Sequence, residues 1–181
     1  MSGKFTAVEI ANFYIQLLNS IPDNSIDNLK INKLLYYVQG WSLVRLGHPM
    51  FDDEIQAWDY GPVIPTVYHI YKCCGKSPIE EPIEAFDEKR LSPKELELLI
   101  DVYTQYGRYT GWALKDMTHV KGGPWDQAYR PKANCRIDLN TMKDYFLGQE
   151  MPTFEVDMTK LDIVKAVPAS WDTEEDCAIY G

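Results

Sequence analysis

Residues 29–41 read LKINKLLYYVQGW, and this stretch decides the fold. Its apolar side chains recur every three or four residues, which is the spacing of one buried helix face. They are Ile31, Leu34, Leu35, Val38 and Trp41. Gly47 follows at a position where helices often end, so we expect a helix over 29–46. Gly40 lies inside this helix, where glycine costs about 1 kcal/mol relative to alanine, so another element is expected to pack closely against it.

Helix-capping residues mark two further helices. Thr6 and Glu9 have the spacing of a capping box, which predicts a first helix beginning there. Ser92 and Glu95 repeat that spacing before a second apolar pattern, and Gly107 is placed to end the helix that follows. These signals favour helices on both sides of residues 29–46.

A short extended segment and a turn are expected next along the chain. Residues 52–58 fit an extended segment. Tyr60, Gly61 and Pro62 predict a turn, because glycine adopts positive φ readily and proline presets the backbone. Proline also suits a first helical turn, so a helix is expected from Pro62 to about residue 74.

The second half of the chain predicts an exposed loop and two more helices. The loop covers 76–91. One helix begins at Thr110 and is expected to bury Leu114, Met117 and Val120. The other covers residues 140–147. The fold class is therefore mainly α: a compact helical domain of about six helices with a short β element.

Charge is distributed unevenly along the 181 residues. The 27 acids and 18 bases leave −9, which argues against nucleic-acid binding because phosphates need a basic surface. Residues 152–181 hold seven acids and two bases, so −5, and residues 80–90 form a second acidic run. We expect a helical domain over 1–151 and an acidic C-terminal extension over 152–181. Such acidic segments suit a basic protein partner.

The C-terminal extension also has a β pattern. Apolar and acidic side chains alternate over 154–158, as in a half-buried strand, and residues 161–167 could pair with it in a β-hairpin.

Several locations and chemistries are disfavoured. The longest wholly apolar run has five residues, at 34–38, whereas a membrane span needs about 20. The N-terminus lacks the apolar core of a signal peptide. The four cysteines form no CxxC pair, which is typical of free thiols in the reducing cytoplasm.

No arrangement of side chains predicts catalysis or cofactor binding. Cys135 and His119 could in principle form a nucleophile and base, but their spacing does not support the pair. His69 and Cys73 could share a helix face, but a zinc site needs a second such pair. Glycine-rich phosphate loops are missing from the sequence. We therefore expect no enzyme activity, no metal and no cofactor.

Two blocks of sequence resemble the Panacea domain, a SocA-like or GepA-like phage-associated family. The first is residues 29–41, and the second, at 49–65, reads PMFDDEIQAWDYGPVIP. The family pattern is similar to L-K-L-x-K-L-L-Y-Y-x-Q-G-W followed by E-x-I-x-A-W-x-Y-G-P-V. A third block, with His119 and Trp125, is similar to the family's L…S-H…P-W element, although Thr118 replaces the serine.

This resemblance implies a mainly α-helical antitoxin that neutralises a protein toxin by direct contact. Two alternatives stay open. The first is a phage-encoded factor that binds host machinery or a host defence protein, including as an adaptor for a AAA+ protease. The second is an enzyme using Cys135, His119 or the carboxylates.

The resemblance also selects the candidate site. The motif residues expected in the core or at the partner interface are Lys33, Tyr36, Trp41, Trp58, Tyr60, Gly61, Pro62, His119 and Trp125. Among these, Trp41, Trp58 and Trp125 are expected to build the core around the turn. Burying Lys33 without a partner would be costly, so it is expected to bind a carbonyl or an acid, or to contact the partner protein.

Overall fold

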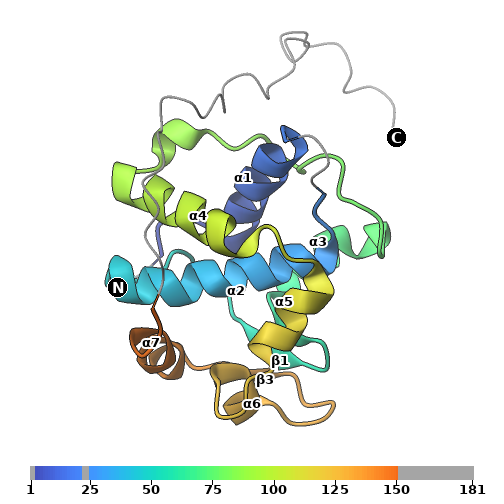
Figure 1. The fold of residues 1–181 in the computed structure, drawn as a ribbon. Helices are drawn as coiled ribbons and strands as arrows, with labels where there is room; N and C mark the ends of the chain where they lie inside the picture. Colours follow the sequence, from blue (N-terminus) through green and yellow to red (C-terminus); the bar gives the residue numbers. More distant parts are fainter. Residues whose placement is uncertain (1–2, 22–24, 151–181) are drawn as a thin grey trace, which may run out of the picture.

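Helix α2 (Asn28–Arg45) runs through the middle of the fold and contacts most of the other elements (Figure 1). Fifteen of its 18 residues are buried, so it is enclosed on all sides rather than along one stripe. The protein is described by a computed structural model over residues 3–21 and 25–150. The expected hairpin at 154–167 and the acidic extension lie outside these residues.

The other helices surround α2. They are α1 (Ala7–Asn19), α3 (Pro65–Tyr71), α4 (Pro93–Tyr106), α5 (Gly111–Thr118), α6 (Pro124–Ala128) and α7 (Leu139–Leu147), with 3₁₀ turns at Lys72–Cys74 and Glu88–Arg90. Both expected capping boxes are present, at the starts of α1 and α4. The prediction of a mainly α fold with a short β element is confirmed.

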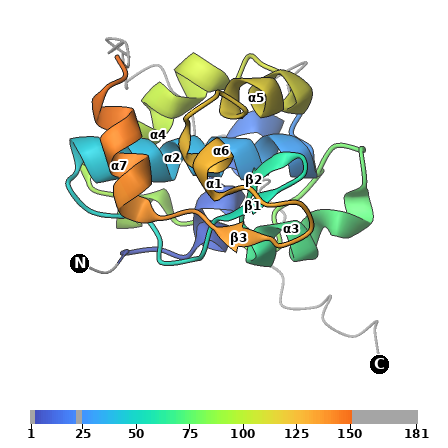
Figure 2. The same ribbon diagram turned by 90° about the horizontal axis from the view of Figure 1, so that it is seen from below.

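Close packing at Gly40 is confirmed. A Cβ atom at this position would lie 2.3 Å from the ring of Phe146, which α7 presents to α2. The ring also meets Trp41 edge-on at 5.2 Å between centroids. Gly40 therefore lets α7 approach α2 (Figure 2).

A small antiparallel sheet lies beside the N-terminal half of α2. Its strands are β1 (Gln56–Trp58), β2 (Gly61–Val63) and β3 (Cys135–Arg136), in the order β2-β1-β3. Gly61 has φ +95°, so the expected turn is present and needs glycine.

The expected helix start at Pro62 is wrong. Pro62 lies in β2, and α3 begins only at Pro65. The tight turn before Gly61 reverses the chain into a strand that pairs with β1. Because β2 is an edge strand, a proline without an N–H group is tolerated there.

Two other expectations need correction. Met117 and Val120 are exposed, because α5 ends at Thr118 and its buried face consists of Gly111, Leu114 and Thr118. The loop over 76–91 is not wholly exposed, since Ile79 and Phe86 insert into the core. Polar bonds also fix this loop. Asn19 donates to the carbonyl of Glu80, and the Phe86 amide donates to Gln16.

Candidate functional site

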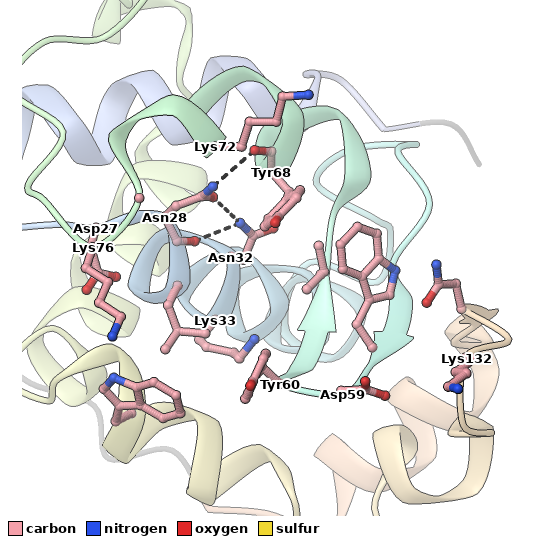
Figure 3. Close-up of a pocket in the computed structure, with 16 residues that line it drawn as sticks. Asp27, Asn28, Asn32, Lys33, Asp59, Tyr60, Tyr68, Lys72, Lys76 and Lys132 are labelled. Atoms are coloured by element: carbon pink, nitrogen blue, oxygen red, sulfur yellow. Dashed lines mark hydrogen bonds between the residues drawn. The ribbon is translucent and has the colours of Figure 1, made fainter.

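A pocket of about 710 Å³ opens where the N-terminal end of α2, the β1–β2 hairpin, α3 and α5 meet (Figure 3). Its walls include Asn28, Asn32 and Lys33 from α2 and Trp58 and Tyr60 from the hairpin. This volume is typical of small-ligand or peptide-anchor sites.

Two asparagines one helical turn apart fix the wall of the pocket. The Asn32 side-chain amide donates to Asn28 Oδ1 at 2.9 Å, and Asn32 Oδ1 accepts from the Ile64 amide at 2.8 Å. Asn28 in turn donates to the carbonyl of Tyr68 at 3.0 Å. These bonds tie the start of α3 to α2, so the pocket has a rigid frame.

Lys33 lies fully buried between α2 and the hairpin and reaches toward Tyr60 (Figure 3). Its ammonium donates to the carbonyl of Pro62 at 2.8 Å. Burial lowers the pKa of Lys33 to about 7, the positive charge of Lys115 acts in the same direction, and Asp27 opposes them. A side chain on Gly61 would collide with Lys33, since its Cβ would lie 2.9 Å from Cε.

Two large aromatic side chains stand exposed at the mouth of the pocket. Tyr60 is 60% exposed and Trp112, near the start of α5, is 53% exposed. Their rings meet edge-on with centroids 5.6 Å apart. Residues more than 50 positions apart in the chain thus form one apolar surface, and such aromatic pairs often anchor partner proteins.

The rim of the pocket is basic. Lys72, Lys76 and Lys132 line it, and none forms an ion pair with another residue of the described part of the chain. The two lining acids already have partners. Asp27 accepts from the Lys30 amide at 2.7 Å, and Asp59 accepts from the Tyr129 hydroxyl at 2.8 Å.

Behind the hairpin, three rings stack in a column. Trp125 lies between His119, at 3.6 Å between centroids, and Tyr129, at 4.6 Å. The Trp125 indole donates to the carbonyl of Trp58 at 2.9 Å. This column supports the hairpin from the side of α6.

One ring nitrogen of His119, Nε2, is buried. Nε2 has no hydrogen-bond partner among the described residues. Burial lowers the pKa of His119, and the charges of Lys115 and Lys33 add to this effect. The imidazole is therefore held toward its neutral form.

The structure separates the candidate residues into two groups. Lys33, Trp58, Tyr60, Gly61, Pro62, His119 and Trp125 lie in or next to the pocket. Tyr36 and Trp41 lie in the core near Phe146, with the Trp41 indole donating to Tyr106 at 3.2 Å. Trp58 is only half-buried, because one side of it faces the pocket.

Sequence reasoning missed the pairing of Trp112 with Tyr60 and the three rim lysines. The lysines come from 3₁₀ and loop segments that no helical pattern links to α2. Asn28 and Asn32 offered a signal. Two asparagines spaced i, i+4 on an otherwise buried helix indicate a polar network, because buried amides need partners.

The described residues contain no group of three or more His, Cys, Asp or Glu side chains placed to hold a metal ion. Over the same residues, none of the helices has the length and apolar character needed to span a bilayer. What the pocket offers is an aromatic mouth and a basic rim, which suit binding of an acidic or aromatic group.

Comparison with known proteins identifies the family. The family model for the SocA-like antitoxin Panacea domain matches residues 31–126. Antitoxin SocA from Caulobacter vibrioides is 31% identical over 145 residues, which span 71% of this chain and 76% of that protein. No solved structure matches. The matched region runs from α2 to α6 and includes most of the pocket, and the chain belongs to the SocA-like antitoxin family with a Panacea domain.

Proposed function

We propose that this chain neutralises a protein toxin by direct contact, using the surface around Tyr60 and Trp112. The observation that carries the proposal is the edge-to-face pair formed by these two exposed rings. Exposed tryptophan and tyrosine beside a pocket are the side chains that most often dominate binding energy at protein interfaces.

Rigid elements support both rings. Trp112 follows the N-cap Thr110, whose hydroxyl accepts from the Ala113 amide, and α5 packs against α2. Tyr60 lies in the turn of the β1–β2 hairpin, which the Trp125 indole and Lys33 hold from two sides. A preformed surface loses little conformational entropy on binding.

The proposal assigns different roles to two regions of the chain. The helical domain over 1–151 carries the docking surface, while the acidic run at 80–90 remains available to basic segments of a partner. We place this activity in the cytoplasm, where the thiols of Cys73, Cys74 and Cys135 would stay reduced. Family membership favours a binding role over catalysis.

The test is co-expression with the reading frame that neighbours the gene. We expect that frame to be toxic alone, to be tolerated when this chain is present, and to co-purify with it. Trp112→Ala should abolish both rescue and co-purification. Leu147→Ala is the matched control, because Leu147 is 58% exposed on α7, away from the strands. Toxicity that persists with the wild-type chain would refute the proposal.

A further inference from the structure

The pocket carries an excess of positive charge on a chain that is acidic overall. Four lysines line it, at positions 33, 72, 76 and 132, against Asp27 and Asp59. Asp27 already accepts a hydrogen bond from the backbone amide of Lys30, and Asp59 accepts one from the Tyr129 hydroxyl. The chain as a whole has a net charge of −9, so this basic lining is a local feature that favours an anionic occupant.

Lys33 lies behind the wall of the pocket and adds to the positive charge there. Its ammonium has three N–H donors, and the bond to the Pro62 carbonyl uses one of them. The side chain is fully buried and borders the pocket. Because none of the Lys33 side chain is exposed, it acts on the pocket through its charge and not through direct hydrogen bonds to an occupant.

The mouth adds a second chemical requirement. Tyr60 and Trp112 expose aromatic faces on which another ring can stack or pack edge-on. The favoured occupant therefore combines one aromatic side chain with several carboxylates.

One segment of this chain has that composition. Residues 171–176 read WDTEED, with one tryptophan, four acids and no base. We propose that this segment binds in the pocket of its own chain, with Trp171 against Tyr60 and Trp112 and its carboxylates beside the lysines. The segment lies in the acidic extension, outside the described residues.

Chain length allows this binding. Twenty residues separate Glu150 from Trp171, and their fully extended reach is about 65–70 Å. As a random coil the same length spans about 25 Å. The preceding helix, α7, packs against α2 at Gly40, about 10 Å along the helix axis from Lys33. The segment can therefore reach the pocket without straining the domain.

Binding of the segment would have a regulatory consequence that rests on the proposed function. The segment and the toxin would compete for Tyr60 and Trp112, so the extension would weaken toxin binding until a partner displaces it. The occupancy itself can be tested without any toxin.

The test uses the full chain and a spin label. Cys177 follows the acidic segment directly, and Cys73→Ser, Cys74→Ser and Cys135→Ser leave it as the only thiol for a nitroxide. We expect the label to broaden the amide NMR signals of Tyr60, Lys76 and Trp112. Circular dichroism checks that the serine variant folds.

Three further samples decide the result. Neutralising the segment with Asp172→Asn, Glu174→Gln, Glu175→Gln and Asp176→Asn should remove the selective broadening at the pocket. Lys72→Glu with Lys76→Glu should remove it too. Lys94→Glu with Lys143→Glu, exposed lysines on α4 and α7, should leave it intact despite the same change in net charge.

A final, mixed sample tests for binding between two copies. It combines isotope-labelled chain that carries no nitroxide with chain at natural isotope abundance that carries the nitroxide. Broadening in this mixture would assign the segment to a second copy and overturn binding within the chain. The inference would also be overturned if the chain with the neutralised segment showed the same broadening as the unaltered segment. It would be overturned equally if the pocket signals of the first sample were not broadened. No sample contains a toxin, so failure here leaves the proposed function standing, and failure of toxin binding leaves this inference unaffected.

Discussion

Replacing Lys33 with methionine tests whether a buried lysine lies at the base of the pocket. The variant removes the ammonium and its bond to the Pro62 carbonyl but keeps a long, unbranched side chain. The informative quantity is the change in the free energy of unfolding with pH, because the loss of the hydrogen bond and of packing is nearly the same at every pH.

The sign and size follow from the pKa of Lys33. It is about 7 in the folded chain, well below the ordinary lysine value of 10.5, so the unfolded state binds more protons between these limits. Stability therefore rises with pH from about 7 toward 10.5, and the penalty of burying the charge is fully present below pH 7. One such group adds about 2 kcal/mol between pH 7 and pH 9.

Among the other shifted groups, Lys30 acts in the same window, because burial lowers its pKa, and it adds a rise of stability with pH that is common to all variants. The remaining shifted groups act mainly outside this window. The lowered pKa of His119 affects stability only below the ordinary histidine value of 6.5. The raised pKa of buried Tyr14 and Tyr36 matters only above pH 10. The raised pKa of Cys74 acts near pH 9 with the opposite sign, and it is common to all variants.

Urea unfolding followed by circular dichroism at pH 7, 8 and 9 measures the effect. Wild type and the control Lys143→Met, which removes an exposed lysine from α7, should gain about 2 kcal/mol over this range. The free energy of unfolding of Lys33→Met should rise much less over the same range. A slope in Lys33→Met equal to that of the control would refute the buried position and the lowered pKa of Lys33.

Three further substitutions test the core around α2. Gly40→Ala should destabilise the fold by about 1–3 kcal/mol in thermal or urea unfolding, and by less in a Phe146→Leu background, because the new Cβ meets that ring at 2.3 Å. An equal cost in both backgrounds would contradict this packing. Gln39→Ala should lower the free energy of unfolding by about 3 kcal/mol, because the Gln39 side-chain amide donates to the carbonyl of Phe51 and accepts from its N–H. A cost below about 0.5 kcal/mol would show that water replaces these bonds.

Local signals in the sequence identified the helices and failed where the next element depended on tertiary pairing. The apolar spacing over residues 29–46 predicted a helix, and the glycine at position 40 predicted close packing against it, which Phe146 provides. Pro62 carried a helix-start signal, but pairing of β2 with β1 outweighed it. Proline fits both positions, so only the neighbouring strand decides between them.

The pocket could be predicted only in part, for a geometric reason. The motif placed Lys33, Trp58 and Tyr60 among the candidates, and these residues do meet in the pocket. Trp112 and Lys132 join them from segments far away in sequence, and local periodicity says nothing about such contacts. The sequence also does not distinguish an aromatic residue buried in the core from one exposed at an interface, because both occur in the same sequence pattern.

The most direct test is the affinity of the purified chain for the product of the neighbouring reading frame, the proposed toxin, measured by calorimetry for wild type, Trp112→Ala and Leu147→Ala. Truncating a hot-spot aromatic side chain costs about 2 kcal/mol or more of binding free energy, so Trp112→Ala should weaken binding by about thirtyfold or more. Leu147→Ala should change the dissociation constant less than about twofold, because single exposed apolar residues away from an interface contribute little. An unchanged affinity in folded Trp112→Ala would contradict the claim that this surface binds the toxin.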